Sequence, residues 1–166
     1  VARLVRRWAG IATGESVATH QDKLRDLTRE IRSPDEARRA ALFLGELLGA
    51  PYPSGTSPLL DAARADVRLM NDVLRSALFD LLAAHLARRP VFVVLDDMQW
   101  TDEPSLTLLG DALMRFGDRP LSVLALERPG AEASRSLFAR QNPVRLELGP
   151  LSARAAQRLV RRALGP

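Results

Sequence analysis

The chain has 166 residues, about the length of one domain, and its 46% hydrophobic and 27% charged residues are typical of a globular protein with a buried core. It contains no cysteine, which excludes disulfides, thiolate metal sites and a cysteine nucleophile. The net charge of +4 comes almost entirely from arginine, but the arginines alternate with acids, as in Arg25-Asp26, so we expect solvated helix faces and no direct nucleic-acid contact.

The N-terminal segment is not a targeting signal. The apolar stretch of residues 1–8 is too short and too charged for a signal peptide. No apolar run approaches the roughly 18 residues that span a bilayer. Because the first residue is Val1, we expect the chain to begin inside a longer protein, and we expect that protein to be cytoplasmic, with no membrane contact.

Two helices are predicted before residue 50. In residues 17–32 the apolar side chains share one helical stripe. Ser33 is a good N-cap, Pro34 suits the first helical position and Glu36 completes a capping box. We expect this second helix to run to about Leu48, with Gly49 beyond its end.

A loop and a long helical region follow. Residues 50–58 hold three prolines, a glycine and two serines, which is typical of a loop. Residues 59–89 have apolar side chains at spacings of three and four, with a possible break near Arg68. Core packing, and not a cofactor site, explains the stripe of Met70, Leu74, Leu78 and Leu81.

The second half alternates between strand and helix patterns. Continuous apolar runs predict strands at 91–95 and 121–126, and the first of them reads as buried on both faces. A helix is expected at 104–116, a short helix around 131–140 and a third strand at 144–148, before a final helix capped by Ser152. This order predicts an α/β fold with a parallel sheet.

The first of these strands ends in two carboxylates, Asp96 and Asp97. Ligands of open α/β sheets bind at the carboxyl ends of strands, and a metal ion with its phosphates is the usual reason for adjacent acids there. The alternative is a core strand whose acids merely cap the following turn or helix. The pair alone does not decide between the two interpretations.

Four motifs in the second half of the chain form a recognisable pattern: Asp96-Asp97-Met98-Gln99-Trp100-Thr101-Asp102, Ser105-Leu106-Thr107-Leu108-Leu109, Leu124-Ala125-Leu126-Glu127-Arg128-Pro129 and Leu148-Gly149-Pro150-Leu151-Ser152. With these motifs, residues 88–128 resemble the Walker B strand and the following strand of the AAA-like ATPase modules of bacterial STAND proteins. These signalling NTPases occur in large transcriptional regulators and in proteins with a serine/threonine kinase domain. Residues 43–49 and 57–64 resemble the kinase-fused branch.

The resemblance implies a P-loop NTPase-like fold with a partial parallel sheet. Residues 1–89 would be a helical insert before the Walker B strand, 90–149 the α/β core and 150–166 the start of a helical lid. It also implies ATP and Mg²⁺ as cofactors, and kinase or sensor domains of the same chain as partners.

The resemblance also implies roles for three residues. Asp96 would hold Mg²⁺ through water, and Asp97 would polarise the water that attacks the γ-phosphate. Arg128 would stand at the sensor position, on the strand between the Walker A and Walker B strands, and would reach the γ-phosphate. The alternative for Arg128 is a surface arginine before a Pro-Gly turn.

The chain departs from the family at two points. Gln99 replaces the usual histidine after the acid pair, and no Gly-x-x-x-x-Gly-Lys-Ser/Thr loop occurs in the 166 residues. Residues 9–14 contain glycines but no lysine. Two explanations remain open: a fragment of an ATPase, or a degenerate module that never hydrolyses ATP and serves protein–protein contact.

The remaining candidates have structural interpretations. We expect Trp100 to be a wedge over the strand end, and Asp102 to be a helix cap rather than a third catalytic acid. His20 and His85 lie in helical sequence with no acid in suitable register, so we expect neither to be functional.

Overall fold

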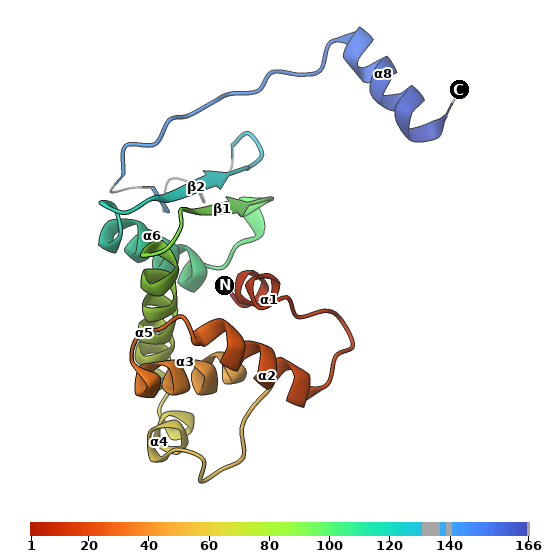
Figure 1. The fold of residues 1–166 in the computed structure, drawn as a ribbon. Helices are drawn as coiled ribbons and strands as arrows, with labels where there is room; N and C mark the ends of the chain where they lie inside the picture. The colour runs from red at the N-terminus through yellow and green to blue at the C-terminus, as the bar shows by residue number, and fades with distance from the viewer. Residues whose placement is uncertain (131–136, 139–140, 166) are drawn as a thin grey trace.

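The computed structural model describes residues 1–130, 137–138 and 141–165, and has a mixed α/β fold (Figure 1). The predicted helix around 131–140 lies mostly outside these residues. No described helix has the length and apolar character needed to cross a membrane. The elements in chain order are α1 (Ala2–Trp8), α2 (Val17–Thr28), α3 (Pro34–Leu47), α4 (Pro58–Ala65), α5 (Val67–Leu86), β1 (Val91–Leu95), η1 (Met98–Trp100), α6 (Glu103–Arg115), β2 (Leu121–Ala125) and α8 (Ala153–Leu164).

The two predicted central strands pair in parallel. Val91 lies opposite Leu121, and the register continues to Leu95 opposite Ala125. The connection between them contains α6, which lies on the same side of the sheet as α5 (Figure 1). The prediction of a parallel α/β sheet is therefore confirmed, although the described part of the sheet has two strands.

The helices that the structure describes cover only one face of this sheet. Val93 is 7% exposed on the covered face, whereas Phe92 and Val94 on the opposite face are 65% and 51% exposed. In Figure 1 all of the covering helices lie below the strands. The prediction that β1 is buried on both faces is therefore wrong for the described chain, because the second covering layer is not among these residues.

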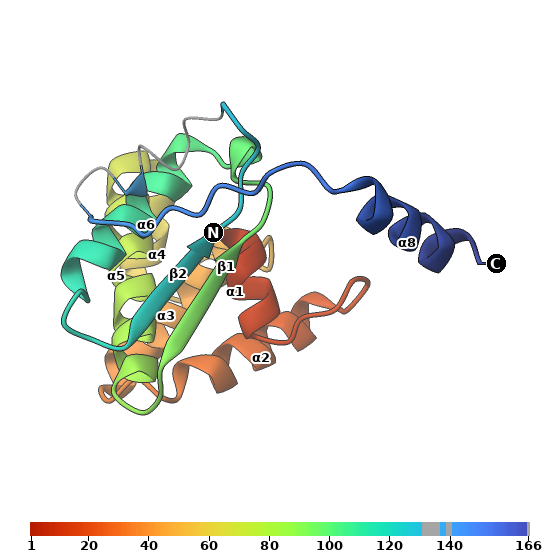
Figure 2. The ribbon, with the colours of Figure 1, turned by 90° about the horizontal axis from the view of Figure 1, so that it is seen from above.

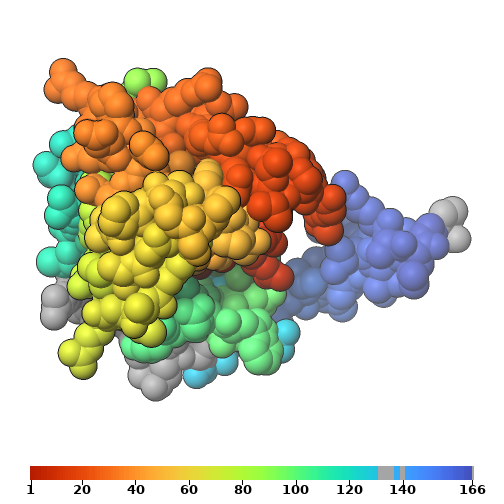
Figure 3. All heavy atoms as spheres, turned by 90° about the horizontal axis from the view of Figure 1, so that it is seen from below, coloured from red at the N-terminus to blue at the C-terminus, as the bar shows by residue number. Residues whose placement is uncertain are grey.

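The main apolar core lies within the helical layer. Val5 of α1, Leu24 of α2, Leu44 of α3 and Leu81 of α5 are buried together. Figure 3 shows α2, α3 and α4 packed closely on the side away from the sheet. The stripe that begins at Met70 packs into this core and a neighbouring cluster, as predicted.

Local hydrogen bonds explain where the helices begin and end. The Ser33 hydroxyl accepts from the Glu36 N–H at 3.4 Å, which confirms the predicted start of α3. The break between α4 and α5 falls at Asp66, whose carboxylate accepts from the Arg68 N–H at 2.9 Å. Helix α2 ends four residues earlier than predicted, where the Arg29 N–H turns back to the Asp26 carbonyl at 3.3 Å.

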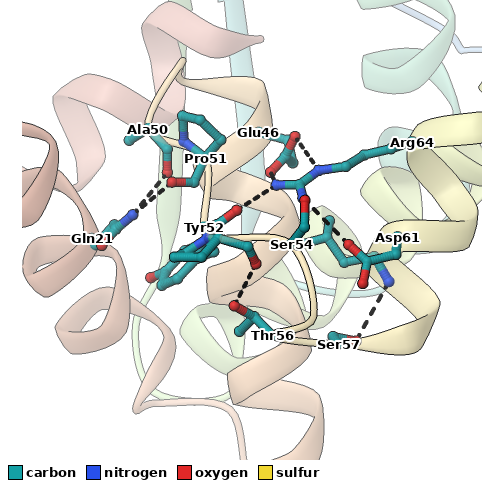
Figure 4. A network of polar contacts seen from close by, with 12 residues as sticks. Gln21, Glu46, Ala50, Pro51, Tyr52, Ser54, Thr56, Ser57, Asp61 and Arg64 are labelled. Carbon is teal, nitrogen blue, oxygen red and sulfur yellow. Dashed lines mark hydrogen bonds and ion pairs between the residues drawn. The ribbon is translucent and has the colours of Figure 1, made fainter.

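The loop between α3 and α4 is held by a polar network (Figure 4). The guanidinium of Arg64 donates to the Glu46 carboxylate and to the Tyr52 carbonyl, each at 2.6 Å. The Gln21 amide donates to the Pro51 carbonyl at 2.9 Å. The loop is thereby tied to α2, α3 and α4 at once.

The predicted third strand at 144–148 is not formed. Val144, Leu146 and Leu148 are 80% or more exposed, and the segment is an extended connection that leads away from the sheet to α8 (Figures 1 and 2). Its alternating apolar pattern suits a strand, but a strand forms only where a neighbouring edge supplies hydrogen bonds. Helix α8 begins at the predicted cap Ser152 and buries none of its residues.

Candidate functional site

The carboxyl ends of β1 and β2 meet at one edge of the sheet. Beyond the strands, the Leu126 N–H donates to the Leu95 carbonyl at 2.8 Å, and the Met98 N–H donates to the Leu126 carbonyl at 3.0 Å. These bonds hold the turn after β1 against the continuation of β2. Asp96 and Asp97 in that turn are exposed, as is Arg128 after β2.

The turn is anchored by a buried side chain. Met98 is fully buried and packs with Leu106 of α6 and Leu137. For Met98 to point inward directly after two exposed acids, the chain must reverse sharply at Asp97. Its dihedral angles of φ 53° and ψ 48° place it in the left-handed region, the one described non-glycine residue with a positive φ.

This conformation stores local strain. A side-chain-bearing residue in the left-handed region costs on the order of 1 kcal/mol, and aspartate and asparagine tolerate it best. Strained backbone of this kind concentrates at binding and catalytic sites. The left-handed conformation of Asp97 leaves its carboxylate exposed at the end of the strand, while Met98 stays in the core.

Gln99 links the two sides of the site. Its side-chain amide donates to the Asp97 carboxylate at 2.8 Å, and its side-chain oxygen accepts from the Arg128 N–H at 3.4 Å. Sequence reasoning noted Gln99 only as a departure from the family pattern. In the sequence, the only indication of this bridging role is that Gln99 lies two residues after Asp97.

The structure therefore brings together Asp97 and Arg128, which lie 31 positions apart in the chain. Asp96 belongs to the same turn, although no hydrogen bond of its side chain enters this bridge. Arg128 contacts the bridge through its backbone N–H, so its exposed guanidinium is not needed to hold the turn.

Asp102 is a helix cap, as predicted. Its carboxylate accepts from the Ser105 N–H at 2.9 Å and from the Ser105 hydroxyl at 3.0 Å. The bond from the Ser105 backbone is the largest cause that lowers the pKa of Asp102 below its usual value, followed by the bond from the hydroxyl. Both carboxylate oxygens are thus occupied by α6.

Trp100 does not act as a wedge. Its side chain is 79% exposed, so the prediction that it covers the strand end is wrong. The buried anchor of this turn is Met98 instead, because the left-handed residue before it turns Met98 inward and leaves Trp100 at the surface.

Among the described residues no group of three histidine, aspartate or glutamate side chains is arranged to hold a metal ion. A site built from protein ligands alone is thus not found in this part of the chain. Mg²⁺ in nucleotide sites is instead held by one or two carboxylates together with phosphates and water. The exposed pair Asp96 and Asp97 fits that smaller requirement.

An apolar cavity of about 390 Å³ lies elsewhere, between α1, α5, α6 and the sheet. Among the described residues that line it, Arg7 alone has a charged side chain, and it lies alongside side chains such as Leu4, Phe79 and Leu109. Polyphosphates require several donors or cations, so this cavity does not suit a nucleotide. The acid pair at the sheet edge remains the better candidate site.

Comparison with protein-family models, with curated proteins and with solved structures found no match for this chain. The class of protein therefore rests on the arrangement of the residues themselves.

Proposed function

We propose that this chain is the metal-binding and sensing half of a P-loop-type ATPase switch, of the kind found in bacterial STAND signalling proteins. The observation that carries the proposal is the hydrogen-bonded bridge from Asp97 through Gln99 to Arg128 at the carboxyl edge of two parallel strands. Open α/β sheets bind ligands at that edge. Asp97 and Arg128 also match the family pattern in the sequence, whereas Gln99 replaces the usual histidine of that pattern.

In this proposal Asp96, Asp97 and Arg128 each have a different role in the ATP site. Mg²⁺ bound with ATP would neutralise charge on the phosphates, and Asp96 would hold that ion through water. One oxygen of Asp97 is fixed by Gln99, which leaves the other free to accept a hydrogen bond from an attacking water. The exposed guanidinium of Arg128 would contact the γ-phosphate and report its loss.

Gln99 would couple these roles. Because one amide contacts both the Asp97 carboxylate and the backbone of Arg128, a shift at either side is transmitted to the other. In this proposal ATP hydrolysis, or occupancy alone, changes the position of the β2 end relative to the turn after β1. The parent protein would be a cytoplasmic signalling protein with kinase or sensor domains in the same chain.

A non-hydrolysing scaffold is the second candidate. The observation that favours it is the exposed apolar face of the sheet, formed by Phe92, Val94 and Leu124, in a chain without a phosphate-binding loop. Such a face suits contact with another protein segment. An ATPase module of a DNA-binding regulator would share the first mechanism and differ only in its fused domain.

Calorimetry with Mg²⁺-ATP tests the proposal. Residues 1–166 alone should bind weakly or not at all, because the phosphate cradle is absent from this sequence. The protein extended upstream should contain a Gly-x-x-x-x-Gly-Lys-Ser/Thr loop and bind Mg²⁺-ATP. An extended protein that has no such loop and no nucleotide affinity would support the scaffold instead.

A further inference from the structure

His85 is a buried titratable side chain outside the proposed ATP site. It lies in the last turn of α5, is 2% exposed and is enclosed by groups from three separate segments. Its Nδ1 lies 3.0 Å from the Leu81 carbonyl, one turn back in the same helix. Its Nε2 lies 3.2 Å from a carboxylate oxygen of Glu30, in the connection between α2 and α3. The expectation that His85 has no acidic partner is therefore wrong.

The ring also contacts α1. The indole of Trp8 packs edge-on against the imidazole, with ring centroids 4.3 Å apart and an interplanar angle of 62°. The other charged groups placed at this cluster are Arg89, whose guanidinium lies 2.9 Å from Glu30, and Arg88 at 4.0 Å. Both arginine side chains are about 60% exposed. Glu30 therefore has exposed arginine side chains on one side and the buried ring of His85 on the other.

The hydrogen-bonding partners restrict the protonation state. Both ring nitrogens lie against atoms that only accept, the Leu81 carbonyl and the Glu30 carboxylate, so each contact is satisfied only when its nitrogen carries a hydrogen. A neutral ring has one hydrogen for these two acceptors, and when that hydrogen is on Nδ1 the Nε2 lone pair lies against the Glu30 carboxylate. If the ring is protonated, both nitrogens carry hydrogens and the same contact becomes an attraction between opposite charges.

We propose that the contact between His85 and Glu30 is a proton-dependent clamp, which fastens α5 to the connection between α2 and α3 when His85 is charged and loosens when it is neutral. The clamp joins segments 55 residues apart in the chain. Helix α5 leads through Pro90 into β1, the strand that ends in the acid pair. The clamp therefore holds the helical layer against the chain just before β1 begins.

Fluorescence of Trp8 gives a direct readout, because a protonated imidazole in contact with an indole quenches its emission and a neutral one quenches it less. Trp100, the other tryptophan, is 79% exposed and is replaced by phenylalanine to remove its signal. In this Trp100→Phe protein, we expect Trp8 emission to rise in one step as the pH is raised and the His85 ring loses its charge.

Two variants and a control identify the partners. His85→Gln should abolish the step. Glu30→Gln should move its midpoint to lower pH, since the negative charge that favours the charged ring is gone. Asp72→Asn, which removes a charge from the exposed side of α5, should leave the midpoint unchanged. A Glu30→Gln midpoint equal to that of the parent protein, or a step that persists in His85→Gln, overturns the clamp.

The unsubstituted protein gives an independent test. Nitrogen NMR of the histidine side chains should show both ring nitrogens of His85 protonated below the step, and only Nδ1 protonated above it. A neutral ring that carries its proton on Nε2 would contradict the geometry on which the proposal depends.

Discussion

At the residue scale, the strained backbone of Asp97 is the feature that shapes the candidate site. Its left-handed conformation separates two side chains that are adjacent in sequence, so that Met98 is fully buried while the Asp97 carboxylate reaches the open edge. Aspartate offers both a tolerable left-handed conformation and the carboxylate that Gln99 binds.

We therefore expect Asp97→Ala to be less stable than Asp97→Gly by about 1 kcal/mol, since glycine adopts this conformation without a Cβ penalty. Asp97→Asn should lie within about 0.5 kcal/mol of the natural protein, because asparagine also tolerates it. Urea unfolding midpoints measure the series. Equal stability of the alanine and glycine variants would mean that the backbone at this position is not strained in solution.

The capping role of Asp102 gives a pH-dependent prediction. Asp102→Ala should destabilise the protein by about 1 kcal/mol near neutral pH, as expected for loss of an N-cap. Because the folded state lowers the pKa of Asp102 below the ordinary value of 3.8, the stabilisation is present above that value and is lost as the pH falls through the lowered pKa.

Unfolding of Asp102→Ala and the natural protein is compared from neutral to acidic pH. The difference between their stabilities should shrink as the solution is acidified through this range. Asp102→Asn retains a capping side chain and is the matched control, with a small loss at every pH. A gap for Asp102→Ala that stays constant into acid would contradict the cap assignment.

At this scale the sequence predicted local roles of single residues, but it did not predict contacts between residues that are far apart in the chain. The cap Asp102 was predictable because its partner Ser105 is three residues away. Glu30 could not be assigned to His85, because the contact depends on how the connection between α2 and α3 lies against α5, 55 positions along the chain. The bridge from Gln99 to Arg128 likewise exists only once the two strands pair.

At the element scale, helix α3 and the loop that follows it approach each other closely. A Cβ added at Gly45 would lie 2.8 Å from the Ala50 carbonyl oxygen and 2.9 Å from the Tyr52 ring. The same loop is fixed by Arg64 and Gln21, so it cannot move away cheaply. Gly45 is therefore required by packing, although glycine weakens a helix interior.

A pair of matched substitutions separates packing from helix propensity. Gly45→Ala should destabilise by about 1–3 kcal/mol through overpacking. Gly110→Ala, in the interior of α6, meets its nearest outside atom at 3.5 Å and should be neutral or stabilising by up to about 1 kcal/mol. Thermal unfolding distinguishes them, and a stabilising Gly45→Ala would show that the loop is not held against α3.

Element boundaries were predictable where a local signal existed. Ser33 with Pro34, and Ser152, mark helix starts that the structure reproduces. The apolar run at 91–95 predicted a strand but not its exposed face, since burial depends on which layers are present. The segment 144–148 had a suitable pattern but does not pair with an edge of the described sheet, which the sequence alone does not reveal.

At the scale of the whole molecule, the described part of the chain is a helical layer that carries a sheet with one face open. The core among α1, α2, α3 and α5 is well buried, so the helical layer supports the strands from one side. The exposed acid pair and Arg128 at the sheet edge are half of a nucleotide site in our proposal. The apolar residues on the open face are where further chain or a partner would pack.

ATP turnover by the protein extended upstream of residue 1 tests the central claim most directly. The comparison is between the natural protein, Asp97→Asn and the capping control Asp102→Asn. Our account predicts that Asp97→Asn lowers turnover at least tenfold, because general-base assistance typically contributes about 10²–10⁴-fold, while Asp102→Asn retains it. Turnover by Asp97→Asn at the natural rate would contradict the assignment of Asp97 and, with it, the proposed function.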